Sequence, residues 1–248
     1  MITTKNPKEI QKMRDGGKIL AGVLDELEQM VKPGLDLLDL EKKAAKLITE
    51  KGAKPSFKGY QGYPSILCLS VNEQVVHCIP RKRIVKEGDL VSIDCGVKYL
   101  GLFTDSARTV PAGNVSPEAQ KLLNVTQEAL KAGIKQVKDG NTVGDVGRAI
   151  QDVVEKQGLS VVKSLVGHGV GYAVHEDPRI PNYGEPKTGV VLREGMMICL
   201  EPMVNLGASE VDFSDDGWTV TTSDKSLSAH FEHTILVTKT GAEIITKK

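Results

Sequence analysis

The sequence has few aromatic residues and lacks any long apolar run. Aromatic residues make up 4% of the 248 positions, and tryptophan occurs once. No apolar run approaches the roughly 20 residues that a membrane-spanning helix needs. Residues 1–6 also lack the long apolar core of a secretory signal. We therefore expect a cytoplasmic protein that does not act at a membrane.

An excess of one charge is absent too, because 32 lysines and arginines balance 32 aspartates and glutamates. A chain without net charge has no broad electrostatic surface for nucleic acid, so we predict no direct nucleic-acid binding. The four cysteines, Cys68, Cys78, Cys95 and Cys199, form no Cys-x-x-Cys pair. In a chain of this length they indicate reduced thiols rather than a disulfide framework.

What the sequence does contain is one pattern that occurs twice. Residues 85–94 and 192–201 each combine a Glu-Gly turn, an apolar run and a carboxylate at the end. The turn at 31–34 is matched in the same way by residues 137–140. We therefore predict one domain, 1–248, built from an internal repeat of approximately 1–110 and 111–248.

Each half is predicted to be built as helix, helix and strands. Apolar residues recur at helical spacing between Pro7 and Val31, and Ser116-Pro117 begins a second long helix that runs to Gln136. Shorter helices are expected at about 38–51 and 143–157, each stopped by a glycine. The branched, glycine-bounded segments that follow are expected to be strands, which makes the fold class α+β.

Two pairs of carboxylates are expected to face each other across hairpins. Asp94 and Asp105 flank a predicted turn at 98–101, and Glu201 and Glu232 flank an Asp-Gly hairpin signal. Directly opposed residues share one face of a sheet, with Cβ atoms about 5 Å apart. Four clustered carboxylates repel one another unless cations lie between them. Surface carboxylates that each pair with a lysine are the alternative, which the repeat disfavours.

The five histidines add a ligand of another type. His168 has a glycine on each side, which lets a ligand approach its imidazole closely. Carboxylates with some imidazole suit Mn, Fe, Co or Zn, so we predict two divalent ions per chain. By themselves His77 and His175 are more typical of satisfied buried histidines. His230 and His233 are expected to point away from the site.

Longer motifs around these residues resemble the signature of the methionine aminopeptidases, in family order over nearly the whole chain. They read PSFKGY at 55–60, SVNE at 70–73, GHGVG at 167–171, HEDP at 175–178, IPN at 180–182, EPMV at 201–204, DGWTV at 216–220 and SLSAHFEHT at 226–234. The resemblance is to the short bacterial type I form. It implies the pita-bread fold of this metallopeptidase family, in which two pseudo-symmetric halves surround a central antiparallel sheet and a dinuclear metal site.

The resemblance also implies a role for each residue that matches a motif. The implied metal ligands are Asp94, Asp105, His168, Glu201 and Glu232. The implied catalytic residues are Glu201, which carries the proton, and His77 and His175, which contact the substrate and the intermediate. The implied methionine pocket is lined by Tyr60, Tyr63, Cys68 and Trp218, with Phe57 where its wall begins.

The activity that follows from the resemblance is removal of the initiator methionine from nascent or newly made proteins with a small second residue. A hydroxide that bridges the two metal ions is expected to attack the peptide bond. A monomer is expected, and ribosome association is left open.

One segment departs from the type I pattern. Thr104-Asp105 and the Arg108-Thr109 pair that follows are closer to relatives that cleave X-Pro bonds. An X-Pro aminopeptidase or dipeptidase of the same fold therefore stays an alternative. So does a non-catalytic pita-bread protein that binds peptides, histones or RNA.

Overall fold

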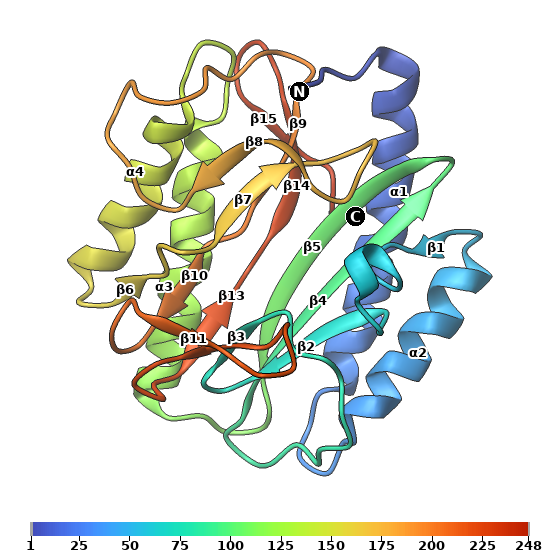
Figure 1. The fold of residues 1–248 in the computed structure, drawn as a ribbon, viewed down its shortest axis with the longest axis vertical. Helices are drawn as coiled ribbons and strands as arrows, with labels where there is room; N and C mark the ends of the chain where they lie inside the picture. The colour runs from blue at the N-terminus through green and yellow to red at the C-terminus, as the bar shows by residue number, and fades with distance from the viewer. Residues whose placement is uncertain (1, 248) are drawn as a thin grey trace.

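Two pairs of helices cover one side of a layer of strands in the computed structural model, which describes residues 2–247. The first pair is α1 (Pro7–Met30) and α2 (Leu37–Glu50), and the second is α3 (Pro117–Gln136) and α4 (Val143–Lys156). Figure 1 shows the pairs at opposite sides of the molecule, with the strands between them. The four predicted helices are thus confirmed, and their ends lie within one residue of the expected positions.

Local sequence explains where these helices begin. Asn6 accepts hydrogen bonds from the Lys8 and Glu9 amides, and the Glu9 carboxylate accepts one from the Asn6 amide. Thr142 and Asp145 form the same reciprocal cap at the start of α4. Such caps satisfy amides that have no partner inside the helix. Within residues 2–247, no helix is long and apolar enough to cross a membrane.

The strands are antiparallel to their neighbours and form four sheets in the described part of the chain. The first half contributes β1 (Lys54–Pro55), β2 (Leu67–Val71), β3 (Gln74–Val76), β4 (Leu90–Tyr99) and β5 (Leu102–Pro111), with a 3-10 turn at Tyr60–Gly62. The second half contributes β6 (Ser160–Val161), β7 (Val166–Gly169), β8 (Glu176–Pro181), β9 (Met197–Leu200), β10 (Met203–Asn205), β11 (Val211–Phe213), β12 (Val220–Thr222), β13 (Ser228–His230), β14 (His233–Val237) and β15 (Ala242–Ile244).

The β4–β5 hairpin has a different register from the one predicted. Asp94 pairs with Ala107, and Asp105 pairs with Gly96, so the two aspartates are not directly opposite each other. The reason is a tight turn at Leu100-Gly101, where φ is 46° and 91°. A two-residue turn with positive φ places the centre of the hairpin at a later position in the chain than the longer turn that we expected, and this changes which residues pair. Because the offset is two residues, both aspartates still lie on the same face of the sheet.

The second pair of carboxylates lies where two ladders meet. Glu201 lies between β9 and β10, and Glu232 lies between β13 and β14. The ladder of β9 with β14 ends directly beside them, and the ladder of β10 with β13 continues on their other side. The Asp216-Gly217 signal falls in the loop of the β11–β12 hairpin, as the sequence predicts.

A seam of hydrogen bonds joins β5 to the segment 230–234 and brings the two halves together. The Glu232 amide donates to the Ala107 carbonyl at 2.9 Å, and the Ser106 hydroxyl donates to the Glu232 carbonyl at 2.7 Å. The Asp105 amide donates to the Thr234 hydroxyl at 2.9 Å. Both carboxylate-bearing segments are therefore held in place through their backbones.

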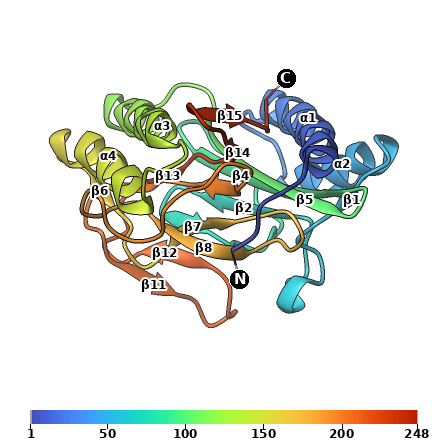
Figure 2. The ribbon, with the colours of Figure 1, turned by 90° about the horizontal axis from the view of Figure 1, so that it is seen from above.

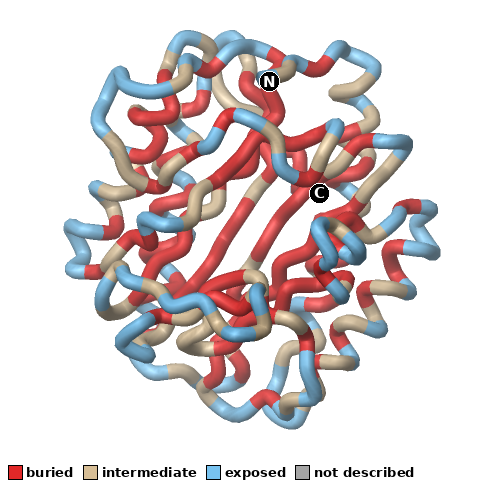
Figure 3. The backbone as a smooth tube through the Cα atoms, viewed as in Figure 1, coloured by how far each residue is buried: buried red, intermediate tan, exposed pale blue. Residues whose placement is uncertain are grey.

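Apolar packing on the two helix pairs supports this seam. One buried cluster lies under α1 and α2 and another under α3 and α4, with Leu20, Leu40, Leu122 and Ile150 fully buried among them. Figure 3 shows that buried stretches run through the central strands, while the outer faces of the helices are exposed. Each such side chain stabilises the fold by about 1.5–3 kcal/mol relative to an exposed one.

Candidate metal centre

Three buried carboxylates meet at the seam. Oxygen atoms of Asp94, Asp105 and Glu232 lie within 4.8 Å of one another. Asp105 is 4% exposed and Glu232 is 2% exposed. One oxygen of each carboxylate has no hydrogen-bond partner within the described residues. Buried polar atoms without partners are rare in folded proteins, so these three oxygens fit a site for a cation.

Glu201 and His168 extend the cluster. The Nε2 atom of His168 lies 3.4 Å from a Glu201 carboxylate oxygen. The Nδ1 atom of His168 lies 2.9 Å from the Gly169 carbonyl oxygen, so the proton of a neutral ring belongs on Nδ1. Burial, followed by the nearby His175, lowers the pKa of His168 to about 3. A neutral ring with its Nε2 lone pair directed at carboxylates can coordinate a metal ion.

Burial and mutual repulsion disfavour ionisation of the clustered carboxylates. Burial raises the pKa of Asp94, Asp105, Glu201 and Glu232, and for the last three the charges of neighbouring carboxylates raise it further. A divalent cation reverses this effect, since it favours the ionised form of every carboxylate that it contacts. The donor set of carboxylate oxygens and one imidazole therefore fits divalent metal ions.

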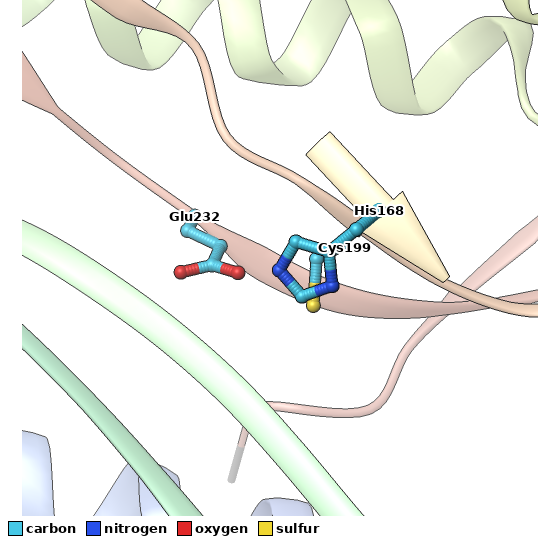
Figure 4. Close-up of side chains that lie close together, drawn as sticks. All are labelled: His168, Cys199 and Glu232. Carbon is cyan, nitrogen blue, oxygen red and sulfur yellow. The ribbon is translucent and has the colours of Figure 1, made fainter. Parts of the chain in front are cut away.

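Cys199 is a close neighbour of the cluster that the sequence did not indicate. Its sulfur lies within 4.8 Å of donor atoms of His168 and Glu232, and Figure 4 shows the three side chains gathered in one place. The sulfur is also 3.5 Å from the Thr234 hydroxyl. Burial raises the pKa of the Cys199 thiol well above its ordinary value. A protonated thiol is a poor metal ligand, so the carboxylates and His168 remain the better donors.

His230 also lies at the cluster, contrary to expectation. Its Nε2 atom is 3.7 Å from a Glu201 carboxylate oxygen, and neither ring nitrogen has a hydrogen-bond partner within residues 2–247. Burial and the nearby His77 lower the pKa of His230 to about 3. His233, by contrast, points elsewhere, with Nδ1 2.9 Å from the Thr246 hydroxyl.

The cluster lies in a cavity of about 780 Å³ that opens to solvent. The residues that we selected from the sequence all line this cavity: Phe57, Tyr60, Tyr63, Cys68, His77, Asp94, Asp105, His168, His175, Glu201, Trp218 and Glu232. Val174, Glu176 and Thr3 line it as well and were not predicted.

Two histidines face the cavity beside the carboxylates. The rings of His175 and His168 meet edge to face, with centroids 4.4 Å apart, and Nδ1 of His175 lies 3.2 Å from the Tyr60 hydroxyl. His77 has φ 59°, a left-handed conformation that is uncommon outside glycine. Burial, followed by the nearby His175, lowers the pKa of His77 to about 4. Both rings can therefore be neutral donors at neutral pH.

The wall of the cavity is apolar. Phe57, Tyr63, Cys68 and Val174 form one buried cluster, and Trp218 packs against it. The Tyr63 and Trp218 rings meet edge to face at 5.0 Å. The single proton of the Tyr63 hydroxyl is shared between the carbonyl oxygens of Leu67, at 2.9 Å, and Cys78, at 3.1 Å, so its polar end is satisfied away from the cavity. This wall suits an apolar side chain.

Comparisons with known proteins agree with this chemistry. A model of metallopeptidase family M24 matches residues 11–239. A methionine aminopeptidase of Mycoplasma capricolum is 48% identical over the whole chain and 99% of its own length, and methionine aminopeptidase 1 of Bacillus subtilis is 47% identical over the full length of both. The crystal structure of a methionine aminopeptidase from Thermotoga maritima superposes with a TM-score of 0.98, 48% identity and full coverage of both chains.

The chain therefore belongs to metallopeptidase family M24 and, within it, to the methionine aminopeptidases. Its fold is the pita-bread fold, as predicted from the sequence. The prolidase from Pyrococcus furiosus superposes with a TM-score of 0.80, but it is 24% identical, and 65% of it is covered. That likeness concerns the fold alone, so the X-Pro alternative is not favoured.

Proposed function

We infer that this chain is a metal-dependent aminopeptidase that removes the N-terminal methionine from polypeptides. The observation that carries this inference is the cluster of buried carboxylate oxygens without hydrogen-bond partners at the wall of an apolar cavity. Unpartnered carboxylate oxygens in the cluster favour the binding of cations, and the apolar cavity wall suits a methionine side chain. Full-length relatives with the same activity in their names support the same conclusion.

We propose that Asp94, Asp105, His168, Glu201 and Glu232 hold two divalent ions. Their donor atoms are carboxylate oxygens and one imidazole nitrogen, which suit Co, Mn, Fe or Zn. When bound there, divalent ions would supply a Lewis acid for the scissile carbonyl and would lower the pKa of a water molecule.

Glu201 is proposed as the group that moves the proton. One carboxylate oxygen lies 3.4 Å from Nε2 of His168, and the other lies 3.7 Å from Nε2 of His230. Glu201 also lines the cavity. From this position it can accept a proton from the attacking water and pass it to the leaving amine. Such proton transfer contributes about 10²–10⁴-fold to the rate.

His175 and His77 are proposed as hydrogen-bond donors to the substrate. A Tyr60 hydroxyl that donates to Nδ1 of His175 leaves the proton of the ring on Nε2. That N–H can then stabilise negative charge on the carbonyl oxygen as the bond breaks. A neutral, half-buried His77 can donate to the peptide backbone in the same way.

The apolar wall is proposed to select methionine. Phe57, Tyr63, Cys68 and Trp218 would enclose the side chain, and a thioether makes favourable contacts with aromatic rings. A pocket of this kind discriminates by about 1–3 kcal/mol per methylene. We also propose that the second residue of the substrate must be small. The chain is proposed to act in the cytoplasm on newly made polypeptides, and to be a monomer with a single domain.

The test is peptide cleavage by the purified chain after removal of metal with a chelator. The stripped protein is reloaded with Co, Mn, Fe or Zn and assayed on Met-Ala-Ser and Ala-Pro-Ala. We expect no activity without metal and preferential cleavage of Met-Ala-Ser with it. Preference for Ala-Pro-Ala would refute the proposed substrate, and full activity after verified removal of metal would refute the proposed site.

A further inference from the structure

The segment before α1 is tied to a residue far along the chain. The Lys5 ammonium lies 2.9 Å from a carboxylate oxygen of Glu176, the first residue of β8. The side chains are 1% and 9% exposed. The Thr3 hydroxyl donates to the same oxygen at 2.8 Å, and the Lys5 ammonium also contacts that hydroxyl. Figure 2 shows the N-terminal segment running down from α1 to the edge where β8 lies.

The other oxygen of Glu176 holds the loop between β7 and β8, residues 170–175. It accepts the amide N–H of Tyr172, and that of Ala173 at 3.0 Å. One carboxylate thus connects the N-terminal segment to the backbone of this loop. Burial opposes ionisation of Glu176, yet the hydrogen bonds from Lys5 and Thr3 hold its pKa below the ordinary value.

Lys5 packs against the loop as well as pairing with it. Its ammonium lies 4.2 Å from the centre of the Tyr172 ring. A side chain at Gly171 would collide with the end of the Lys5 side chain, so glycine is required for this approach. The backbone of Lys5 is anchored separately, because its amide donates to the Gly195 carbonyl at 2.8 Å. The lysine therefore reaches the loop from a fixed backbone.

The same loop carries two residues of the substrate cavity. Val174 belongs to the apolar wall, and His175 is the proposed donor to the substrate carbonyl. His175 comes directly before Glu176, so displacement of the Glu176 carboxylate would displace His175. A donor of this kind has to be held to within a fraction of an ångström to be effective.

We propose that Lys5, together with Thr3, is a positioning residue for His175. Lys5 and Thr3 hold the Glu176 carboxylate through hydrogen bonds, and the carboxylate holds the loop 170–175 through two backbone amides. The loop in turn keeps the His175 imidazole directed into the cavity. This inference rests on the proposed role of His175 in peptide cleavage. It gives Lys5 and Thr3 a part in the reaction, although neither is a proposed metal ligand.

The test compares Lys5→Met with Lys8→Met. Methionine keeps an unbranched apolar stem and removes the ammonium, which leaves Glu176 without its buried cation. Lys8 is exposed at the start of α1 and serves as the matched control. Each variant is measured for metal content, for kcat and KM on Met-Ala-Ser, and for hydrogen exchange of peptides that cover residues 170–175.

For Lys5→Met we expect faster exchange in 170–175, unchanged metal content and a kcat lowered by about 10- to 100-fold, the range for a misplacement of about 1 Å. Lys8→Met should match the wild type. The double variant Lys5→Met/Glu176→Gln removes the unpaired buried charge, so it should regain stability without regaining kcat. If Lys5→Met does not fold, the double variant and Thr3→Val provide the same comparison.

Unchanged exchange in 170–175 and an unchanged kcat in a folded Lys5 variant would overturn the proposal. So would faster exchange spread evenly over the protein, because that result describes general loss of stability. A wild-type protein that does not cleave Met-Ala-Ser would instead count against the proposed function. Hydrogen exchange in residues 170–175 measures how firmly the N-terminal segment holds the loop, and it does so independently of activity.

Discussion

Asp105 of β5 lies directly opposite Gly96 of β4. The position across from this aspartate therefore carries no side chain. A β-carbon at Gly96 would lie 2.9 Å from the Phe57 ring and would also collide with the Ser56 hydroxyl. One glycine thus lets the wall of the cavity close against the strand that carries Asp94.

Gly96→Ala is expected to push Phe57 away from β4. Overpacking of this kind costs about 1–3 kcal/mol of stability, and the shifted ring should raise KM for Met-Ala-Ser. Urea unfolding and steady-state kinetics measure the two effects. Gly241→Ala is the control, because nothing lies within 4 Å of a β-carbon there, and it should change stability by less than about 0.5 kcal/mol. A Gly96→Ala protein with wild-type stability and KM would contradict this account.

Asp105→Asn is expected to have opposite effects with and without metal. In the metal-free protein it removes one of several clustered buried carboxylates, so the free energy of unfolding should rise by about 0.5–2 kcal/mol, the usual gain from one stabilising substitution. With metal present it removes a proposed ligand, and the affinity loss should exceed the roughly 10–100-fold that follows mutation of an outer-shell partner.

Chemical denaturation with and without a chelator, together with metal analysis, measures both effects of Asp105→Asn. Asp215→Asn, at an exposed position, is the matched control and should show neither. Wild-type metal affinity in the Asp105 variant would remove Asp105 from the proposed ligands.

His175→Ala is expected to lower kcat by about 10²–10³-fold, the usual loss when one donor to a developing oxyanion is removed. Metal content should not change, since the proposed ligand is His168. Tyr60→Phe removes the hydroxyl beside Nδ1 of His175. It should cost up to about tenfold, because one hydrogen bond contributes about 0.5–1.5 kcal/mol. Loss of metal from the His175 variant would show that His175 is itself a ligand.

The pair of Arg14 and Glu243 predicts a dependence of stability on pH. Two hydrogen bonds of 2.7 and 2.8 Å from Arg14 hold the pKa of Glu243 below its ordinary value. A depressed folded-state pKa stabilises the fold above the pKa of the unfolded state, and the contribution is lost as pH falls through the folded-state pKa. The pair is about one third exposed, so its contribution should lie near the 0.2–1 kcal/mol of surface pairs.

Glu243→Gln should therefore destabilise the protein at pH 7 and much less at pH 3, as unfolding of both proteins at each pH would show. Glu50→Gln is the control, because the Glu50 side chain is exposed and its carboxylate oxygen lies 3.8 Å from Nζ of Lys46, a longer ion pair than that of Glu243. An equal destabilisation by Glu243→Gln at both pH values would mean that charge is not the cause.

The helices could be predicted closely from the sequence because their signals are local. Pro7, the Ser116-Pro117 pair and the glycines after α2 and α4 each act within one turn. The motifs also indicated the residues that gather at the cavity. Register was harder, because the centre of the β4–β5 hairpin depends on which residues adopt positive φ, and Leu100 was not expected to do so.

Contacts that depend on tertiary structure could not be predicted. His230 is an exception, because it lies two residues from Glu232 and strand alternation places such a pair on one face; its contact with Glu201 could have been expected from the sequence. Cys199 reaches the cluster from β9, which the sequence showed only as an apolar run. The contacts of Lys5 and Thr3 with Glu176 join positions 171 and 173 residues apart, and no periodic pattern reports such a contact.

The seam has a consequence for how the protein is made. Ser106 and Glu232 are 126 residues apart, and Asp105 and Thr234 are 129 apart. Contacts across such distances form late, after the loop between them has been closed. An unfinished polypeptide, still short of its last strands, therefore cannot assemble the cluster that captures cations. Cleavage activity is expected only after residues 230–234 have paired with β5.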